Sequence, residues 1–484
     1  MGKRSFSQKN TYYDSITLMA LSQKLRQEPG VTDVQIAMGT DHNKELLQEM
    51  GFDDAHLLSA GAQDLLIGVI GDNNVLEGLS IENILALLQA PDSETSGTDQ
   101  KHYASLEAFV STQKKTQKKA DLALISVPGD YAAREAFKSL DAGLNIMMFS
   151  DNVSLEAEKK LKTKALEKGL FMMGPDCGTA IINGVGLGFA NAVKAGPVGI
   201  VGASGTGIQE VCCLLDDFGI GISHAIGTGG RDLHQEIGGI MAAKGLQFLN
   251  EDPQTELICL ISKPPHPEVA QALITQLEAY KKPSVICFLG DTTVHNTSPN
   301  ITCCVTLTDT ALALVTHYQN NPKFSELQLP ETLKLTGKIA GLFCGGTLCS
   351  EAKQILGEGH LLIDYGDDEY TKGRPHPMID PSLRADALLE IGADPQVSGI
   401  LLDFVLGYGS HSDPVSAITD SIKQLRQQRQ LPIFASVTGT DQDPQNKTKQ
   451  ENALKALGVI VAPSNAIAAK MMVSLLQKEK EHVH

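Results

Sequence analysis

Two glycine-rich turns are the residues best suited to chemistry in this sequence. The first, Gly202-Ala203-Ser204-Gly205-Thr206-Gly207, follows a short apolar run and leads into a helical run over 208–218. The second, Gly345-Gly346-Thr347, follows a similar apolar run that starts at Gly337. A strand that ends in glycines and turns directly into a helix directs backbone N–H groups and the positive end of the helix dipole to one place. Each turn therefore predicts a site for a phosphate-like anion.

The phosphate-binding set comprises the small residues of both turns, which are Ser204, Gly205, Thr206, Gly207, Gly345, Gly346 and Thr347. Glycine suits such a turn because a side chain would block close approach to the backbone. The first turn lacks the lysine of a Walker loop, so ATP hydrolysis by this turn is not expected. A purely structural turn without a ligand remains the alternative.

Further reactive side chains follow other strand-like runs. Open α/β sheets bind their ligands at this position, beyond the carboxyl ends of the strands. Lys263 and His411 are candidates for anion contact or proton transfer, although either also fits a surface position. Arg231, with Arg374 as its counterpart, is suited to bind a substrate carboxylate in a bidentate manner; neutralisation of neighbouring acids is the alternative. The loops around these residues predict substrate-binding glycines at Gly229, Gly230, Gly407 and Gly409.

The elements that position these turns repeat along the chain. Asp252-Pro253-Gln254 is echoed by Asp394-Pro395-Gln396, and Pro283 is echoed by Pro432, each before an apolar run typical of a strand. Because these landmarks and the two turns recur at a nearly constant separation, we interpret them as a duplicated α/β domain. Chance likeness between two α/β sheets is the alternative.

Upstream of the repeat, residues 12–90 alternate strand-like and helical runs, which predicts a small α+β module. A polar linker follows at 91–100, and from Asp121 the order strand, helix, strand predicts a βαβ unit. The expected divisions are an N-terminal module at 1–100, a Rossmann-like domain of the CoA-binding type at 101–195, a first ligase-type domain at 196–325 and a second at 337–484.

Composition limits the partners. The 484 residues carry a formal charge of −17, which repels nucleic acid and anionic lipid unless a basic patch lies on one face. The short run Lys114-Lys115 with Lys118-Lys119 is better interpreted as a solvated helix face. No apolar run approaches the ~20 residues that cross a bilayer. We therefore expect neither a nucleic-acid nor a membrane partner.

Cysteine usage points to a reducing compartment. The nine cysteines lack paired C-x-x-C spacing, and the adjacent pairs Cys212-Cys213 and Cys303-Cys304 suit neither an ordinary disulfide nor a zinc site. The start of the chain is polar rather than an apolar signal core. A cytoplasmic protein without a metal site is the expectation.

The motifs together resemble a known family. The run Met173-Gly174-Pro175-Asp176-Cys177-Gly178-Thr179, the first glycine turn and Gly227-Thr228-Gly229-Gly230-Arg231-Asp232-Leu233 are similar to the FdrA proteins, relatives of succinyl-CoA synthetase. The likeness extends to Ser262-Lys263-Pro264-Pro265 and to Arg374-Pro375-His376-Pro377. It implies a Rossmann-like region and two flavodoxin-like ligase domains of the synthetase type, behind the small N-terminal module.

The resemblance implies that the synthetases hold a phosphohistidine between two helix N-termini, one from each ligase domain. Those two helix N-termini match the two glycine turns of this sequence. Two departures matter. There is no room for an ATP-grasp unit between residues 325 and 337, and the Gly-His-Ala-Gly segment is missing after Gly290-Asp291. His295 lies nearby without that glycine context, so it is given no catalytic role.

The expected activity is acyl or carbamoyl transfer with phosphate or an acyl phosphate. The resemblance implies an oxamate carbamoyltransferase-like subunit of allantoin catabolism, which acts on a small acid or ureido substrate with partner subunits, as an oligomer. Carbamoyl phosphate is then a ligand and CoA a possible one. An acyl-CoA ligase or CoA-transferring enzyme, and a scaffold that binds ligand without turnover, are the alternatives.

Overall fold

The computed structural model describes residues 2–11, 13, 15–26, 28–89, 103, 105–116, 120–293, 298–325, 327, 329, 333–371 and 375–480. These residues divide into two compact units. The first comprises Met1–Lys119, Ser126–Tyr131 and Lys372–Pro375, and the second comprises Ala120–Ile125, Ala132–Thr371 and His376–His484. The expected linker at 91–100 and the pair Lys118-Lys119 lie outside the described residues.

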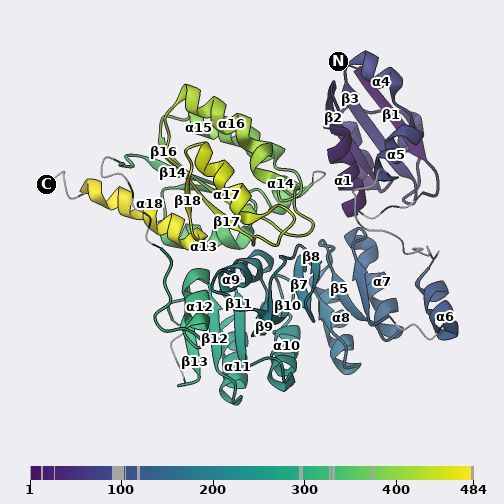
Figure 1. Ribbon diagram of the computed structural model, residues 1–484. Helices are drawn as coiled ribbons and strands as arrows, with labels where there is room; N and C mark the ends of the chain where they lie inside the picture. The colour runs from purple at the N-terminus through teal and green to yellow at the C-terminus, as the bar shows by residue number, and fades with distance from the viewer. Residues whose placement is uncertain are drawn as a thin grey trace. The chain divides into compact units, whose positions relative to one another are not determined.

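The first unit contains the small α+β module predicted from the alternating pattern (purple in Figure 1). Its antiparallel sheet has the order β1-β3-β2, from β1 (Gly2–Gln8), β2 (Val31–Met38) and β3 (Leu65–Gly71). Apolar side chains of β3 pack with buried residues of the helices to form its core. The helices are α1 (Ser15–Arg26), α2 (Asp41–Glu49), α3 (Ala55–Leu58), α4 (Asn73–Gly78), α5 (Ile81–Gln89) and α6 (Leu106–Thr116).

A short parallel sheet follows, as the strand, helix, strand pattern predicted. Its order is β4-β5-β6, and each strand pairs with its neighbour in parallel. Its elements are β4 (Leu122–Ile125), α7 (Gly129–Asp141), β5 (Asn145–Met148), α8 (Leu155–Glu167) and β6 (Met172–Met173). Ser154 begins α8 because its side chain accepts from Ala157 N–H, which satisfies one of the orphan donors of the first turn.

The first glycine turn belongs to a seven-stranded sheet of order β13-β12-β11-β9-β10-β7-β8. Five of these strands run parallel, and β7 and β8 continue the sheet antiparallel. The strands are β7 (Thr179–Ile182), β8 (Val185–Gly188), β9 (Ala195–Gly202), β10 (Ile222–Gly227), β11 (Leu257–Ser262), β12 (Ser284–Phe288) and β13 (Ile301–Cys304). The helices are α9 (Gly205–Asp217), α10 (Ile240–Glu251), α11 (Pro267–Glu278) and α12 (Leu307–Val315).

The second glycine turn belongs to a five-stranded parallel sheet of order β15-β14-β16-β17-β18. The strands are β14 (Lys338–Phe343), β15 (Leu361–Asp364), β16 (Val397–Val405), β17 (Ile433–Thr438) and β18 (Ile460–Ala462). The helices are α13 (Gly346–Leu356), α14 (Asp368–Thr371), α15 (Ser382–Ala393), α16 (Pro414–Gln428), α17 (Lys447–Ala456) and α18 (Asn465–Lys480).

The two sheets repeat one topology. In chain order, β10-β9-β11-β12-β13 and β15-β14-β16-β17-β18 both read 2-1-3-4-5, the flavodoxin-like arrangement. The register repeats as well, because Val198 pairs with Leu257 and the equivalent Ile339 pairs with Gly399. The mixed α/β fold with two flavodoxin-like sheets is therefore confirmed.

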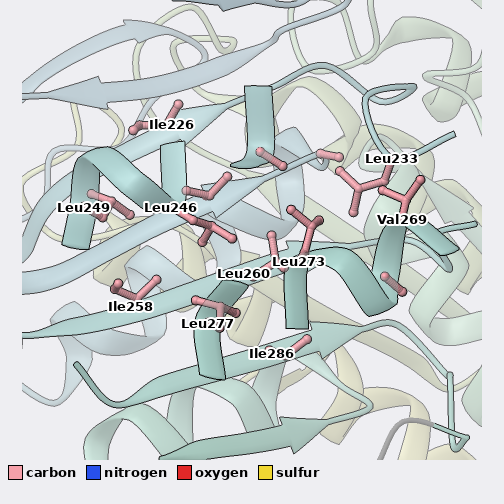
Figure 2. Packing of buried hydrophobic residues seen from close by; sticks show 14 of the residues in the cluster. Ile226, Leu233, Leu246, Leu249, Ile258, Leu260, Val269, Leu273, Leu277 and Ile286 are labelled. Carbon is pink, nitrogen blue, oxygen red and sulfur yellow. The ribbon is translucent and has the colours of Figure 1, made fainter. Parts of the chain in front are cut away.

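The core of the first sheet lies between its strands and the helices α10 and α11. Figure 2 shows Leu246 and Leu249 of α10 and Leu273 and Leu277 of α11 beside the strand residues Ile258 and Leu260. All of these side chains are buried. The central parallel strands β11 and β12 are buried along their whole length, so their sequences do not alternate between apolar and polar residues.

The described helices include none that is both long and apolar enough to traverse a bilayer. All nine cysteines are unpaired thiols, and all except Cys303 and Cys304 are buried. Burial raises the pKa of Cys177 and Cys349 to about 12, so these thiols are poor nucleophiles.

Candidate functional site

The first glycine turn connects β9 to α9. Helix α9 begins at Gly205, inside the glycine run and not at Ile208 as expected, because Ser204 Oγ accepts from Gly207 N–H at 3.2 Å and caps it. Ala203 N–H donates to Ile261 O of the neighbouring strand. Within the described residues no acceptor is recorded for the N–H groups of Gly205 and Thr206. This end of α9 therefore keeps donors for an external anion.

The second glycine turn is occupied differently. The N–H groups of Cys344 and Gly345 both donate to the carboxylate of Asp403, each at 2.7 Å. Asp403 is fully buried in β16, the neighbour of β14. Of the predicted set, only the N–H of Gly345 is engaged by this carboxylate, and the phosphate-binding role of Gly346 and Thr347 stays a prediction. The sheet places an internal carboxylate where the sequence predicted an external anion.

Asp403 in turn holds a buried arginine. Arg384 Nη2 of α15 lies 3.1 Å from Asp403 Oδ1 and donates to the carbonyl oxygens of Asp403 and Leu342. Both side chains are almost wholly buried, so each charge depends on the other. The carboxylate that accepts from the second turn is therefore itself held by a buried ion pair.

The two turns meet. Ser204 Oγ and Thr347 Oγ1 share a buried hydrogen bond of 2.6 Å, and Thr347 N–H donates to Thr206 Oγ1 at 3.4 Å. Thr206 and Thr347 occupy the same place in the two copies of the fold. The N-termini of α9 and α13 thus face one another, with both positive dipole ends at one point. The structure brings together Ser204, Thr206 and Thr347 from the predicted phosphate-binding set.

A pair of buried glutamates repeats this symmetry deeper in the interface. Glu210 of α9 accepts from Asn465 N–H at the start of α18 and from the hydroxyl of Thr438. Glu351 of α13 accepts from Leu307 N–H at the start of α12, at 2.7 Å, and from Asn465 Nδ2. Each helix of the candidate site therefore caps a helix of the other copy. Burial raises the pKa of Glu210, and it raises the pKa of Glu351 to about 7.

We expect Glu351→Gln to flatten the pH dependence of stability. The folded protein keeps the Glu351 proton up to about pH 7, whereas the unfolded chain releases it near pH 4.5, the ordinary pKa of a glutamate. This contribution to the free energy of unfolding is present below pH 4.5 and is lost by about pH 7, at a cost of about 3 kcal/mol. Urea unfolding from pH 4.5 to 8 measures the effect. Glu358→Gln, at an exposed position of the same segment, should keep the wild-type slope.

Lys263 and two carboxylates lie at the strand ends beside the turns. Lys263 follows β11 and is exposed, and its charge opposes the burial that raises the pKa values of Asp176 and Asp364. Asp364 ends β15, and its Oδ2 lies 2.5 Å from the position that a β-carbon on Gly346 would take. The Asp364 carboxylate therefore lies close to Gly346, the first residue of α13.

Arg231 is anchored by protein groups. Its Nη2 donates to Val153 O at 2.7 Å and lies 2.8 Å from Glu158 Oε2, and its side chain is 33% exposed. Glu158 also pairs with the buried Lys162, which contacts Asp232 Oδ1 at 2.8 Å. The structure thus supplies the neighbouring acid that the alternative for Arg231 requires, which is Glu158. A role in binding a substrate carboxylate stays a prediction.

Gly407 and Gly409 serve packing. Both have a positive φ, and a β-carbon on Gly407 would lie 2.5 Å from Ala190 O. Gly407 N–H donates to Gln445 Oε1, and Tyr408 N–H donates to Ala190 O. The N–H of Gly407 is therefore engaged within the protein, and a substrate contact by Gly407 or Gly409 stays a prediction.

The remaining predicted residues make other contacts. Gly229 and Gly230 pack against the loop at Pro175 and Asp176. His411 accepts from Asp413 N–H through Nδ1, and burial lowers its pKa; its recorded contacts do not include the glycine turns. Arg374 and His295 lie outside the described residues.

Three segments of the chain match models of known protein families. Residues 1–104 match AllF, heavy metal-associated domain; residues 193–290 match a CoA binding domain; and residues 342–474 match a CoA-ligase. The two later matches each contain one of the two glycine turns.

The first of these names implies a metal that the residues do not fit. No cysteine precedes Cys177, so the first match lacks the thiolates that soft metals prefer. In the described part of the chain no group of three or more His, Cys, Asp or Glu side chains is placed to hold a metal ion.

Curated relatives give the family. Uncharacterized protein YahF of Escherichia coli (strain K12) is 41% identical over 94% of this chain and 95% of its own length. Succinate–CoA ligase [ADP-forming] subunit alpha of Aquifex aeolicus (strain VF5) is 31% identical over 30% of this chain and 48% of its own length. Malate–CoA ligase subunit alpha of Methylorubrum extorquens is 28% identical over 36% of this chain and 60% of its own length.

The chain therefore belongs to the YahF family, an FdrA- and AllF-like branch of the succinyl-CoA-synthetase-like proteins. It spans about half the length of the curated α subunits that it matches.

The sequence predicted the turns but missed most of the charges that surround them. Asp403 carried a local signal, because it interrupts the apolar run Leu401-Leu402-Asp403-Phe404-Val405, where an unpaired charge would be costly. Asp176 stood in the family motif without a role. Glu210 and Glu351 look like ordinary helix-surface residues in the sequence, and only the packing of the two copies buries them.

Proposed function

We propose that this chain is a subunit of an acyl-CoA ligase-like enzyme that holds phosphate or an acyl phosphate at the facing N-termini of α9 and α13. The hydrogen bond between Ser204 and Thr347 carries the proposal, because it joins helix ends from the segments that match the CoA-binding and CoA-ligase models. Two positive helix ends at one point favour an anion between or beside them.

The donors for that anion come mainly from the first turn. Gly205 and Thr206 offer N–H groups without a recorded acceptor, whereas Asp403 occupies two donors of the second turn. Such fixed N–H groups stabilise charge that develops on a phosphoryl or acyl oxygen during transfer. Lys263 supplies an exposed positive charge near Asp364, and we assign it to the incoming anion. Arg231 is the proposed contact for the substrate carboxylate.

Partner subunits are part of the proposal. The matched CoA ligases are named as α subunits, and this chain has no room for an ATP-grasp unit between residues 325 and 337. CoA would be a substrate at the segment that matches the CoA-binding model. Phosphate activated by ATP would have to be supplied by another subunit.

Carbamoyl transfer is the second candidate, and one observation favours it. The segment after Gly290-Asp291 lacks the Gly-His-Ala-Gly run, so no histidine stands in that context to relay phosphate from ATP. A reaction that uses phosphate directly, such as phosphate with oxalurate to give oxamate and carbamoyl phosphate, needs no such histidine.

Gly207→Ala tests the proposed pocket. Its β-carbon would overlap Ser204 Oγ and lie 3.2 Å from Thr347 Cγ2, so the contact between the turns cannot form unchanged. We expect a loss of about a hundredfold in turnover, because the displaced turn would no longer direct the N–H groups of Gly205 and Thr206 to the developing oxyanion. The assay uses the chain co-purified with the products of its neighbouring genes. It measures acetyl-CoA from acetyl phosphate and CoA, and carbamoyl phosphate from oxalurate and phosphate.

Gly78→Ala is the matched control, because nothing lies within 4 Å of its β-carbon position. It should retain wild-type turnover. Thioester formation alone supports the ligase proposal, and carbamoyl phosphate alone supports the second candidate. Equal turnover of Gly207→Ala and wild type in either reaction would remove the glycine turns from the chemistry.

A further inference from the structure

Asp176 lies at the carboxyl edge of the seven-stranded sheet, in the loop between β6 and β7. Its N–H donates to Ser150 O at 3.0 Å, and its φ is 54°. Its Oδ2 lies 3.4 Å from the position of a β-carbon on Gly230, in the loop that follows β10. The carboxylate therefore lies between the loop after β5, which holds its backbone, and the loop after β10.

The carboxylate itself is open. No hydrogen bond to its side chain is recorded from the described residues, and the residue is exposed, so solvent reaches its carboxylate oxygens. Four charged groups surround it: Asp151 and Asp368 on the acidic side, and Arg231 and Lys263 on the basic side. Partial desolvation, followed by the two neighbouring acids, raises the pKa of Asp176 to about 6, while the two cations oppose the rise. Asp176 can thus exchange a proton near neutral pH.

The strand that follows this loop, β7, reaches the glycine turns at its first residue. Thr179, three residues further on, has its Oγ1 3.3 Å from the β-carbon position of Gly205 at the start of α9. Lys263 acts on both Asp176 and Asp364, and Asp364 contacts Gly346 at the start of α13. Asp176, Lys263 and the two helix ends therefore share one edge of the protein, where a bound anion and an attacking group would meet.

We propose that Asp176 is the general base that accepts the proton of an attacking thiol. The inference rests on the proposed function, acyl transfer from an acyl phosphate to CoA. In that step the sulfur forms a bond to the acyl carbon, and the bond from that carbon to the phosphate oxygen breaks. The thiol proton passes to an Asp176 carboxylate oxygen, and phosphate leaves toward the N–H groups of Gly205 and Thr206.

Asp176→Asn tests the assignment, because the amide keeps the size of the side chain and cannot accept the proton. With acetyl phosphate and CoA as probes, we expect turnover to fall about a hundredfold at pH 7. Phosphate binding, measured by calorimetry on the same preparation, should persist. The wild-type kcat/KM should decline as the pH falls through about 6, since protonated Asp176 is no base.

Asp151→Asn is the matched charge control. It removes a like charge that helps to raise the pKa of Asp176, so turnover should persist at pH 7.5 while the acidic limb moves to lower pH. Turnover by Asp176→Asn at the wild-type rate, or an acidic limb that Asp151→Asn does not move, would overturn the assignment and leave the proposed function standing. Absence of thioester formation by the wild type would instead reject the proposed function, and this assignment with it.

Discussion

Asp403→Ala is expected to lower the free energy of unfolding by about 3–5 kcal/mol. The substitution leaves the guanidinium of Arg384, which is 4% exposed, without its carboxylate, and it orphans the N–H groups of Cys344 and Gly345. A buried charge without a partner is among the few changes that produce effects of this size. Urea unfolding followed by circular dichroism measures it.

Two further variants separate the causes. Asp420→Ala removes a carboxylate at a fully exposed position of α16 and should change stability by less than about 0.5 kcal/mol. Asp403→Ala combined with Arg384→Met should cost less than the sum of the two single changes, because the pair is lost together. A loss below about 1 kcal/mol for Asp403→Ala would show that the second turn does not depend on this ion pair.

Lys162→Met is expected to destabilise the protein by a similar amount, about 3–5 kcal/mol. Lys162 is fully buried between Glu158 and Asp232, at 2.8 Å from each, and also donates to Thr228 O. Its removal leaves two buried carboxylates without their common cation. Asp232 accepts from Ala242 N–H at the start of α10, so the loss should also loosen the loop that carries Arg231.

Lys160→Met is the matched control, two residues away on α8. Its ammonium pairs with Glu156 in solvent, with side chains 64% and 78% exposed, and such pairs contribute under about 1 kcal/mol. Thermal unfolding of both variants gives the comparison. Equal melting temperatures for Lys162→Met and Lys160→Met would mean that the buried network does not hold the loop.

Local sequence signals were enough to predict the architecture. A strand that runs into Gly202 or Gly345 and then a helix is encoded within a few residues, and its recurrence predicted two sheets with one strand order. The register of Val198 with Leu257 and of Ile339 with Gly399 confirms that the repeat extends through whole strands. Hydrophobic burial and turn geometry, both short-range in sequence, carry this information.

The occupants of the glycine loops could not be predicted in the same way. A glycine in a loop indicates that another group approaches the backbone closely, but it does not indicate whether that group is a ligand or another part of the protein. At Gly407 the approaching group is Ala190 O, and at the second turn the N–H groups meet Asp403, both far away in sequence. Glu210 and Glu351 were missed for the same reason, because their partners belong to the other copy of the fold.

Among the glycines of the two turns, Gly207 and Gly346 are the positions where a substitution tests the shared pocket best. At Gly205 a β-carbon would meet only the side chain of Thr179, whose Oγ1 would lie 3.3 Å away, so a small substitution there is nearly accommodated. At Gly207 it would overlap Ser204 Oγ, and at Gly346 it would lie 2.5 Å from Asp364 Oδ2. Gly207→Ala and Gly346→Ala therefore disturb the pocket from opposite sides, one in each copy of the fold.

Phosphate binding by these two variants, measured by isothermal titration calorimetry on the full chain with its partner subunits, tests the central claim directly. If the facing ends of α9 and α13 hold one anion, the wild type binds one phosphate per chain, and Gly207→Ala and Gly346→Ala each abolish that same event. Two phosphates per chain, or full affinity in one variant and none in the other, would contradict a shared site.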